Sequence, residues 1–310
     1  MKICMVGMGS IGIQHTKNLS LILNEQGIDF QTDALRTQRK PLTDDVNELL
    51  ANIYSSFDEL PYGYDIIFLN TPTNLHFEHL KSAIKHTRHI FIEKPVFDRL
   101  DYSWQGLPWH GDGVYYVACP LRYNSVINYM KNIVESQRIF SVRSICSSYL
   151  PDWRPGIDYR RCYSAKAEQG GGVRIDLIHE WDYLCYLFGT PEKIQQFYGT
   201  YSDLEITSED LALYIAEYPD KLISLHLDYF GRAKRREIEL YTADDVITGD
   251  LYGQTIRYTN ENRIISLPQS REEMQQAELR AFLDMVQGKI NNHNTITNAI
   301  NTLRITLGDV

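Results

Sequence analysis

Hydrophobic and polar positions follow two different periods along the first 120 residues of the chain. Short apolar runs predict strands at residues 2–6, 30–35, 66–70, 89–92 and 114–119. Residues 11–23 instead carry apolar side chains at helical spacing, and this helix is expected to end near Gly27. Because residues 66–69 are continuously apolar, their strand is expected to be buried on both faces. The alternation of strands and helices predicts a doubly wound α/β domain over residues 1–120.

The pattern changes beyond residue 121. It predicts a helix at 125–136, a strand at 142–149, an irregular stretch at 151–169, and then a helix that continues to Phe188. Alternating runs joined by short polar turns follow at 211–218, 222–229, 236–241 and 255–258, which predicts an antiparallel sheet. Helical spacing returns at 272–286 and 296–307. Residues 121–310 are therefore expected to form a second domain that combines helices with this sheet.

Three glycines separate the first predicted strand from the first predicted helix. Gly7, Gly9 and Gly12 have the spacing Gly-x-Gly-x-x-Gly, with Ser10 and Ile11 between the last two. The first glycine allows a tight turn, the second lets the backbone approach a pyrophosphate, and the third lets helix and strand pack closely. The helix N-terminus then faces the anion. Strand, turn and helix in this order favour dinucleotide binding over a purely structural turn.

Two further motifs follow predicted strands. Residues 70–76, Asn-Thr-Pro-Thr-Asn-Leu-His, begin at the carboxyl end of a strand, where ligands bind in open α/β sheets. An ordinary turn that caps a helix through Thr73 or Asn74 explains the same residues equally well. Glu93 and Lys94 follow the next strand, and Pro95 keeps the lysine extended. A lysine there can transfer a proton, although a solvated Glu–Lys pair is the simpler reading of these residues alone.

A third motif starts at the triple glycine, residues 170–172. The helix predicted after it places Asp176 and His179, three residues apart, on one face of an otherwise apolar segment. A histidine beside a carboxylate can act as a general acid or base. A core histidine whose hydrogen bonds are satisfied gives the same pattern, and by itself the pattern favours that alternative.

Together these motifs resemble the glucose-fructose oxidoreductase, inositol dehydrogenase and rhizopine-catabolism (Gfo/Idh/MocA) family of nicotinamide-dependent sugar dehydrogenases. The resemblance covers essentially the whole chain. It rests on the glycine fingerprint, Thr71-Pro72 followed by His76, Glu93-Lys94-Pro95, Leu121-Arg122-Tyr123, and the Gly-Gly-Gly helix with its aspartate and histidine. The implied fold is α/β, with an N-terminal Rossmann doubly wound parallel sheet (1–120) that binds the dinucleotide. The implied C-terminal α+β domain (121–310) has a large, mostly antiparallel open sheet for substrate binding and oligomerisation.

The resemblance also implies an activity, the exchange of a hydride between a nicotinamide and a sugar hydroxyl or keto group. Lys94 is expected to be the acid/base group, with His179 as its catalytic partner, oriented by Asp176. The family commonly sets this aspartate and histidine four residues apart, so His179 carries over more directly than Asp176. The residues expected to bind the cofactor are Gly7, Gly9, Ser10, Ile11, Gly12, Arg36, Thr37, Thr71, Pro72, Asn74, His76, Glu93, Lys94 and Arg122.

The end of the second predicted strand bears on the choice of cofactor. Asp33 is close to the usual spacing of an acid that binds the ribose 2′-hydroxyl, but it lies inside the strand. The strand ends instead at residues 36–40, Arg-Thr-Gln-Arg-Lys. Arginines suit a 2′-phosphate better than a diol, so NADP is favoured over NAD.

A subgroup associated with bacterial surface-sugar pathways is resembled by residues 149–155 and 158–160, together with the triple glycine and residues 178–180. The segment 152–166 is rich in arginine and aromatic side chains, which suit a sugar that carries a carboxylate or phosphate, or is linked to a nucleotide. A surface loop whose arginines pair with local carboxylates such as Asp158 is the alternative.

Composition limits the other possibilities. The 310 residues carry a formal net charge of −9, and the longest basic run, residues 234–236, is expected to be a solvated strand or loop, which argues against a nucleic-acid partner. No segment approaches the ~20 apolar residues of a membrane span, and the N-terminus does not resemble a signal peptide, so a cytoplasmic protein is expected. The five cysteines are scattered without Cys-x-x-Cys spacing, which predicts neither disulfides nor a metal site.

Two other functions fit the same sequence. One is a non-catalytic redox sensor built on a dinucleotide-binding domain, against which the presence of both Lys94 and His179 argues. The other is an enzyme of the same fold that uses tightly held NAD for elimination or glycoside cleavage. By resemblance to the family, the open sheet is expected to be covered by formation of a homodimer or homotetramer.

Overall fold

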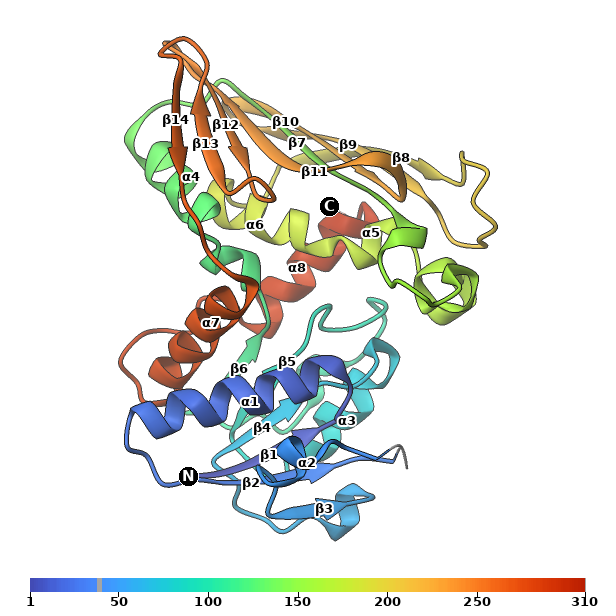
Figure 1. Cartoon of the computed structure of the whole chain (residues 1–310), viewed down its shortest axis with the longest axis vertical. Coiled ribbons are helices and arrows are strands. Elements are labelled where there is room, and N and C mark those ends of the chain that lie inside the picture. Colours follow the sequence, from blue (N-terminus) through green and yellow to red (C-terminus); the bar gives the residue numbers. More distant parts are fainter. Residues whose placement is uncertain (38–40, 310) are drawn as a thin grey trace. The chain divides into compact units, whose positions relative to one another are not determined.

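The computed structural model describes residues 1–37 and 41–309, which form two compact units (Figure 1). The first unit consists of Met1–Cys119 and Arg271–Ile300, and the second of Pro120–Ser270 together with the residues from 301 onward. The first break lies beside the predicted division at residue 120. However, residues 271–300, which the sequence pattern assigns to the C-terminal domain, belong to the first unit, because their apolar side chains complete its core.

The first unit is built on a six-stranded parallel sheet with the strand order β3-β2-β1-β4-β5-β6. This is the order of a Rossmann fold and confirms the predicted doubly wound sheet. The short edge strand β3 was not predicted, because its three residues are too few to show a period. The strands are β1 (Lys2–Val6), β2 (Gln31–Leu35), β3 (Asn52–Tyr54), β4 (Ile66–Leu69), β5 (His89–Ile92) and β6 (Val114–Val117).

Four helices and part of a fifth belong to this unit in the described residues: α1 (Ser10–Glu25), α2 (Asp44–Asn47), α3 (His76–Ala83), α7 (Arg271–Val286) and the start of α8 (Ile296–Leu307). Aromatic packing explains why α7 belongs here. Phe68 of β4 and Phe91 of β5 stack at 4.9 Å, and Phe282 of α7 meets their ring centroids edge-on at 5.8 and 5.3 Å. All three side chains are fully buried.

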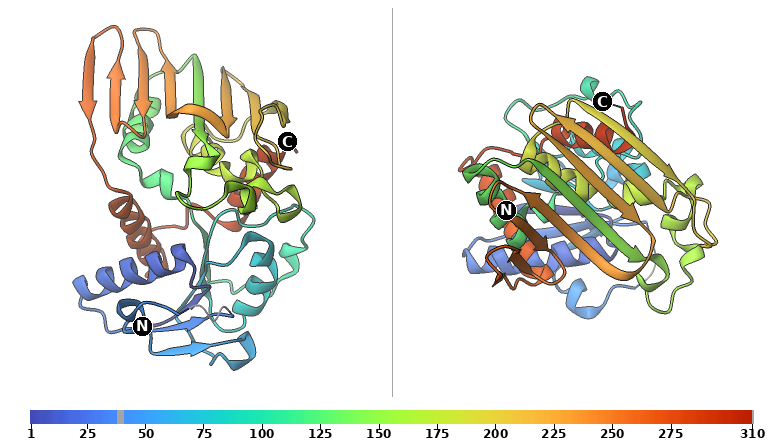
Figure 2. Two further views of the ribbon diagram at one scale, coloured as in Figure 1. Left: turned by 45° about the vertical axis from the view of Figure 1, so that its right-hand side comes forward. Right: turned by 90° about the horizontal axis from the view of Figure 1, so that it is seen from above.

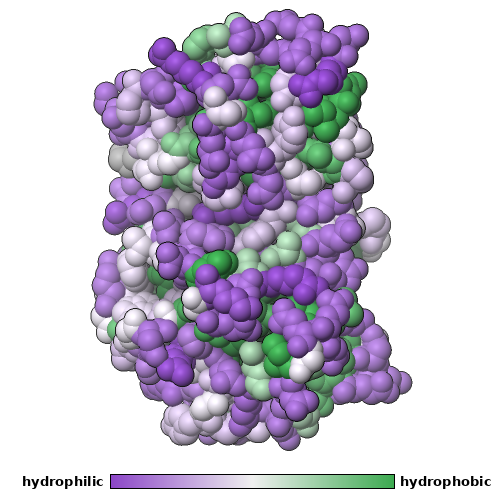
Figure 3. All heavy atoms as spheres, turned by 90° about the vertical axis from the view of Figure 1, so that its left-hand side faces the viewer, coloured by the Kyte–Doolittle hydropathy of each residue, from purple (hydrophilic) through white to green (hydrophobic). Residues whose placement is uncertain are grey.

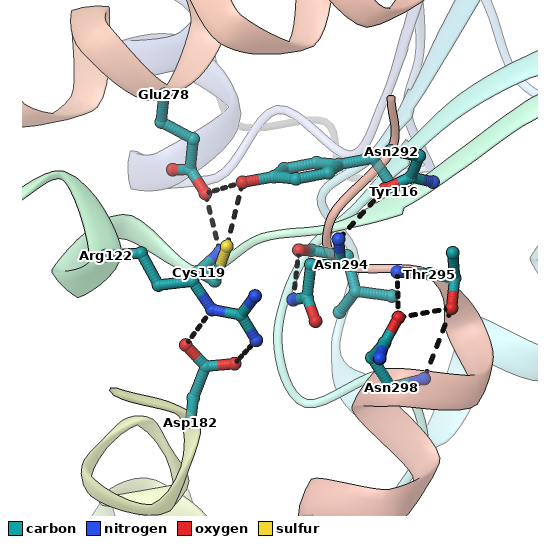
Figure 4. A network of polar contacts seen from close by, with 10 residues as sticks. Tyr116, Cys119, Arg122, Asp182, Glu278, Asn292, Asn294, Thr295 and Asn298 are labelled. Atoms are coloured by element: carbon teal, nitrogen blue, oxygen red, sulfur yellow. Dashed lines mark hydrogen bonds and ion pairs between the residues drawn. The ribbon is translucent and has the colours of Figure 1, made fainter. Parts of the chain in front are cut away.

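A buried carboxylate adds a polar connection between α7 and β6 (Figure 4). Glu278 accepts a hydrogen bond from the Tyr116 hydroxyl at 2.9 Å and another from the Cys119 backbone N–H at 2.5 Å. Farther along the chain, the Asn294 side chain donates to the Val117 carbonyl at 2.8 Å. Residues that follow the second unit in sequence therefore complete the edge of the first sheet.

The second unit contains an eight-stranded sheet with the order β14-β13-β12-β11-β7-β10-β9-β8 (Figure 2). Only β7 and β10 pair in parallel, and every other neighbouring pair is antiparallel, which confirms the predicted sheet. The strands are β7 (Ser141–Tyr149), β8 (Lys193–Gly199), β9 (Leu211–Tyr218), β10 (Lys221–Asp228), β11 (Phe230–Tyr241), β12 (Val246–Asp250), β13 (Thr255–Tyr258) and β14 (Arg263–Ser266).

Helices cover one face of this sheet: α4 (Ser125–Ser136), α5 (Val173–Asp176), α6 (Ile178–Phe188) and the end of α8 (Figure 2). Alternate residues of β9 explain the asymmetry of the two faces. Tyr214 points inward, packs edge-on against Trp181 at 5.3 Å and donates a hydrogen bond to the Thr306 carbonyl at 2.9 Å. Its neighbour Ile215 is 46% exposed on the opposite face.

Several large apolar side chains remain exposed on the strands of this sheet, including Phe197 on β8, Leu213 on β9 and Ile264 on β14. Figure 3 shows one face of the molecule, on which hydrophobic side chains reach the surface among mostly hydrophilic ones. None of the helices in the described part of the chain combines the length and the apolar character that a membrane crossing requires.

The helix predicted after the triple glycine is interrupted. Leu177, with φ −99° and ψ 21°, separates α5 from α6. The irregular stretch before it contains short 3-10 turns at Leu150–Asp152, Tyr159–Arg161, Tyr163–Ala165 and Ala167–Gln169. The interruption at Leu177 places Asp176 and His179 on different helices.

Candidate functional site

The glycine turn connects β1 to α1, as the sequence predicts. Gly7 has φ +92°, and a Cβ atom there would lie 2.9 Å from the Asn70 carbonyl oxygen. A Cβ on Gly12 would lie only 2.1 Å from the Gly7 carbonyl oxygen, whereas one on Gly9 would meet nothing within 4 Å. Gly7 and Gly12 therefore permit close packing inside the turn, and Gly9 leaves its outer side open.

The N-terminus of α1 is suited to an anion. Gly9 is its N-cap residue, no side chain caps the helix, and its first turn contains no acidic residue. Gly9 and Ser10 are both exposed. The first N–H groups of a helix have no partner within the helix and carry a partial positive charge, so this end fits a phosphate group.

The segment that follows β4 lies against the glycine turn, since the Gly7 position closely approaches Asn70 and Thr71. His76 is buried, with Nε2 2.8 Å from the Thr71 carbonyl oxygen and Nδ1 2.9 Å from that of Pro95. Burial lowers the pKa of His76, against the opposing effect of these carbonyls. His76 thus connects two loops at the carboxyl edge of the sheet, and its role in cofactor binding stays a prediction.

The alternative of a capping turn at this segment is wrong. The N-cap residue of α3 is Leu75, and no side chain caps that helix. Thr73 and Asn74 instead lie in a 3-10 turn, Thr73–Leu75.

Glu93 follows β5 and is bound by a histidine that none of the sequence motifs contains. Its Oε1 lies 2.6 Å from Nε2 of His15, a buried residue of α1. Burial favours the neutral carboxyl, but the hydrogen bond and charge of His15 and the charge of Lys94 outweigh it, so the pKa of Glu93 is below its usual value. Because the Glu93 side chain is only 15% exposed, a solvated Glu–Lys pair is the wrong description. The available signal was the position of His15, three residues after Gly12 on the fingerprint helix.

The two candidate residues for cofactor selection, Asp33 and Arg36, have different positions on β2: Asp33 lies inside the strand and Arg36 follows its end. Asp33 is fully buried, and its carboxylate accepts hydrogen bonds from Tyr64 at 2.7 Å, Asn52 at 2.9 Å and Gln31 at 3.1 Å. It is therefore committed to the interior of the unit. Arg36 is the first residue after the strand. Thr37 follows it, and the predicted positions 38–40 lie outside the described residues.

In the second unit, Asp176 and His179 have different partners. Asp176 is buried and its Oδ2 accepts a hydrogen bond from the Tyr229 hydroxyl at 2.7 Å. His179 Nε2 is hydrogen-bonded to Nη2 of Arg236 and lies 3.4 Å from the carboxylate of Glu180. His179 thus contacts Arg236 and Glu180, and its orientation by Asp176 stays a prediction.

Arg236 and Glu180 were not identified from the sequence. Arg236 belongs to the basic run that the pattern places in solvent, which is correct for Arg235, an exposed partner of Glu237. For Arg236 it is wrong, because its guanidinium is largely buried and its Nε lies 2.8 Å from the fully buried carboxylate of Glu180. The alternation of sides along β11 was the available signal, since it turns Arg236 toward the helices.

Arg122, a predicted cofactor-binding residue, forms a buried ion pair with Asp182 of α6 (Figure 4). Its Nε and Nη2 donate to the two carboxylate oxygens at 2.9 and 2.8 Å. This pair connects the 3-10 turn Pro120–Tyr123 to α6. A contact of Arg122 with the cofactor stays a prediction.

Residues 152–166 were predicted either to recognise an acidic sugar or to form a surface loop with paired arginines, and different arginines of the segment fit each interpretation. Arg160 pairs with Asp158 at 2.9 Å and with Glu205 at 2.6 Å, as the alternative of a surface loop requires. Arg154 instead lines a small hollow together with Trp153 and Tyr159. The described residues contain no group of three or more His, Cys, Asp or Glu side chains that could hold a metal ion.

Two family models match the chain. Residues 1–103 match an oxidoreductase family with an NAD-binding Rossmann fold, and residues 127–247 match the GFO/IDH/MocA C-terminal domain. An uncharacterized oxidoreductase of Bacillus subtilis, YrbE, is 29% identical over 191 residues, which are 60% of this chain and 53% of that protein. Myo-inositol 2-dehydrogenase of Thermotoga maritima is 25% identical over 213 residues, 64% of this chain and 58% of that protein. The chain thus spans about half the length of these curated relatives.

Solved structures have the same fold. A UDP-N-acetylglucosamine 3-dehydrogenase from Acidithiobacillus ferrooxidans superposes with a TM-score of 0.78 at 18% identity, over 100% of this chain and 96% of the other. Scyllo-inositol dehydrogenase from Lactobacillus casei, with bound NAD(H) and scyllo-inositol, gives 0.79 at 18% identity over 99% and 95%.

Proposed function

This chain belongs to the Gfo/Idh/MocA oxidoreductase family, and from that premise we propose that it is a nicotinamide-dependent dehydrogenase acting on a CH–OH group of a sugar or sugar derivative. The observation that carries the proposal lies in the first unit. Its sheet brings the carboxyl ends of β1, β4 and β5 to one edge, because these parallel strands are neighbours. The open glycine turn, the Asn70–Thr71 segment and Lys94 all follow those ends.

The residues at this edge fit a dinucleotide. The uncapped N-terminus of α1 would hold the pyrophosphate, and the open side of Gly9 would let it approach the backbone. When bound, the nicotinamide supplies the hydride chemistry, and the protein positions the reactants and moves the proton.

Lys94 is the proposed proton-transfer group. In the oxidative direction its unprotonated amine accepts the proton of the substrate hydroxyl, and in the reductive direction its ammonium returns one. The hydrogen bond between Glu93 and His15 supports this role, since it fixes the residue next to Lys94 against the fingerprint helix. His179 is the proposed second group at the reacting oxygen, by resemblance to the family.

The experiment that tests this function is a screen of sugars with oxidised cofactor, followed by the absorbance of the reduced nicotinamide. We expect one class of sugar to give a steady rate. Cofactor binding without turnover on any sugar would indicate a redox sensor instead. Cofactor that copurifies, with sugar consumed and no net absorbance change, would indicate the elimination or glycoside-cleaving chemistry.

NADP is the proposed cofactor in preference to NAD. Two observations support it: the Asp33 carboxylate already accepts three hydrogen bonds inside the unit, and Arg36 stands at the strand end. An arginine there suits a 2′-phosphate, and a committed aspartate is a poor partner for the 2′-hydroxyl. Fluorescence titration with NADPH and NADH checks the preference, and NADH binding that is tenfold tighter would overturn it.

The proposed substrate is a sugar that carries a carboxylate or phosphate, alone or linked to a nucleotide. Arg160 is already paired with the carboxylates of Asp158 and Glu205. The residues that support this substrate are therefore Arg154, Trp153 and Tyr159, which line a small hollow. A structural neighbour is a UDP-N-acetylglucosamine dehydrogenase by name. A thermal-shift panel of neutral and acidic sugars is the test, and stabilisation by neutral sugars alone would contradict the proposal.

A homodimer or homotetramer formed through the open sheet of the second unit is the proposed assembly. The exposed apolar side chains of β8 and β9 support it, since their burial would stabilise an interface.

A further inference from the structure

His76, the first residue of α3, is surrounded by hydrogen-bond acceptors in the first unit. Its Nε2 lies 2.8 Å from the Thr71 carbonyl oxygen, and its Nδ1 lies 2.9 Å from the carbonyl oxygen of Pro95 and 3.2 Å from that of Val96. His76 is only 1% exposed, so its ring depends on these contacts. A carbonyl oxygen can accept a hydrogen bond but cannot donate one.

Only a doubly protonated ring satisfies both sides of this arrangement. A neutral imidazole has one N–H, so its other nitrogen would point a lone pair at a carbonyl oxygen. An imidazolium has two N–H groups and can donate to Thr71 on one side and to Pro95 on the other. The hydrogen-bonding geometry of His76 therefore favours a second proton on the ring.

The burial of His76 opposes that second proton. Burial lowers the pKa of His76, whereas the three carbonyl oxygens and the charge of Glu93 act in the opposite direction without cancelling the effect. The N-terminus of α3 carries a partial positive charge and also disfavours an imidazolium. His76 is therefore neutral near pH 7 before a cofactor binds, and one of its carbonyl contacts then has no donor.

Glu93 is the acidic group that acts on His76, and its charge is shared with two other residues. Its Oε1 lies 2.6 Å from Nε2 of His15 on α1, and the charge of Lys94 also acts on it. This carboxylate favours a positive charge on His76 but only partly offsets burial. A further negative charge beside these segments would favour the imidazolium more strongly.

A dinucleotide would supply such a charge. The glycine turn, where the pyrophosphate is proposed to bind, packs against the segment that contains Thr71, since a Cβ atom on Gly7 would lie 2.9 Å from Thr71 Cγ2. The carbonyl oxygen of the same Thr71 contacts His76. Because an anion stabilises the charged form of a nearby imidazole, binding of the pyrophosphate raises the proton affinity of His76.

We propose that His76 takes up a second proton from solvent when the dinucleotide binds, and that the resulting imidazolium donates to Thr71 and Pro95 at once and fixes these two segments of the cofactor site. This rests on the proposed function. His76 is thus a positioning residue, because it acts through the backbone of both segments and takes no part in hydride transfer. By linkage, a group that gains a proton on binding makes the affinity for the cofactor rise as the pH falls.

The test counts protons by titration calorimetry of the full-length protein near pH 7, in buffers of different ionisation enthalpy. The probe is NADPH, or NADH if that cofactor binds more tightly. We expect His76→Gln, whose amide cannot become charged, to take up fewer protons per bound cofactor than the wild type. Ionisation of the 2′-phosphate cancels in this comparison, since both proteins bind the same ligand. Equal proton uptake by the two proteins overturns the proposal.

His79→Gln is the matched control. His79 lies on the same helix, and its Nδ1 is 2.9 Å from the Thr71 hydroxyl, which can donate or accept, so a neutral ring satisfies this contact. Burial lowers the pKa of His79, and the charge of Glu78 opposes that effect. We expect His79→Gln to take up as many protons as the wild type. If uptake were lost in His79→Gln and retained in His76→Gln, the proposal would be wrong.

The wild-type protein gives a second readout that does not depend on the folding of a variant. Ring nitrogen shifts of His76 are measured in protein with ¹⁵N-labelled histidine and are assigned by through-bond correlation to the backbone. Near pH 7 we expect one ring N–H before the cofactor is added and two in the complex. A ring that is singly protonated in both states, or doubly protonated in both, overturns the proposal.

The pH dependence of affinity separates this inference from the proposed function. Between about pH 8 and pH 6, the wild type should gain about 3- to 10-fold in cofactor affinity relative to His76→Gln. A protein that binds neither NADPH nor NADH would contradict the proposed function itself. Cofactor binding with no change in the protonation of His76 would contradict only this inference.

Discussion

At the scale of single residues, Lys94 has the most direct consequence for activity. It follows β5 at the edge where the glycine turn also lies, and its neighbour Glu93 is tied to His15. Lys94→Ala is expected to lower kcat by about 10²- to 10⁴-fold, the usual contribution of a general acid or base. Titration should show that the variant still binds the cofactor. Unchanged turnover in a folded variant would eliminate the role of Lys94.

Arg36 offers a second residue-scale prediction. If it pairs with the 2′-phosphate, Arg36→Ala removes a charge-assisted hydrogen bond and should weaken NADPH binding about 10- to 100-fold. NADH, which lacks that phosphate, serves as the internal control and should bind nearly as before. Equal losses for the two cofactors would show that Arg36 does not read the phosphate.

At the scale of elements, two glycines of the turn are expected to have different roles: Gly12 is needed for folding and Gly9 for cofactor binding. Gly12→Ala would place its Cβ 2.1 Å from the Gly7 carbonyl oxygen, so the turn must shift. We expect a loss of stability on the order of 1–3 kcal/mol in denaturant unfolding. Gly9→Ala meets nothing within 4 Å and has an ordinary φ of −75°, so stability should be retained while cofactor affinity falls. Equal unfolding curves for the two variants would contradict this division.

The hydrogen bond between α1 and β5 predicts a dependence of stability on pH. The pKa of Glu93 is held below its ordinary value of 4.5, so the folded protein prefers the carboxylate more than the unfolded chain does. That stabilisation is fully present above the ordinary pKa and is lost as the pH falls through the lower folded value.

The variant Glu93→Gln checks this pH dependence. Above about pH 5 it should be less stable than the wild type by about 1.5–3 kcal/mol, and the difference should shrink as the pH falls toward 3. Thermal unfolding at a series of pH values measures it, with Glu59→Gln, an exposed glutamate whose pKa is also lowered by local hydrogen bonds, as the comparison. If the stability difference between wild type and Glu93→Gln grew as the pH fell, the ionised Glu93 carboxylate would not be what stabilises the fold.

Elements that depend on local pattern could be predicted, and those that depend on distant contacts could not. The strand, turn and helix around Gly7 follow from spacing, since each residue constrains its neighbours. The partnership of His15 with Glu93 joins residues 78 positions apart, and no local pattern contains it. The same holds for Arg236, whose burial depends on Glu180 in another element.

The break at Leu177 shows why the contacts of the candidate site residues could not be predicted from the local sequence pattern. Periodicity places Asp176 and His179 on one helical face, which holds only while the helix continues. The backbone of Leu177 ends α5, and Asp176 accepts a hydrogen bond from Tyr229, which lies between β10 and β11. The residue types of the site were therefore recognisable from the motifs, but the partner of His179 was not.

At the scale of the whole molecule, the open face of the eight-stranded sheet predicts self-association. Phe197 and Leu213 are paired across β8 and β9 and are 67% and 38% exposed, and Ile215 lies two residues farther along β9. Leu213→Glu/Ile215→Glu would place charges on this surface and should shift the protein toward monomer in analytical ultracentrifugation. Ile53→Glu, at an exposed edge strand of the first unit, is the control and should not alter the assembly. Assembly unchanged in the double variant would exclude this face as the interface.

The path of the chain between its two units has a consequence for how such a gene can be rearranged. The chain passes from one unit to the other three times, after Cys119, after Ser270 and after Ile300. A single recombination event anywhere between the first and last of these passages would join part of one parent's core to an unmatched part of another's. Exchange of the second unit requires two separate stretches to be inherited together. New specificities in this architecture are therefore expected to arise by point changes within loops more readily than by domain shuffling.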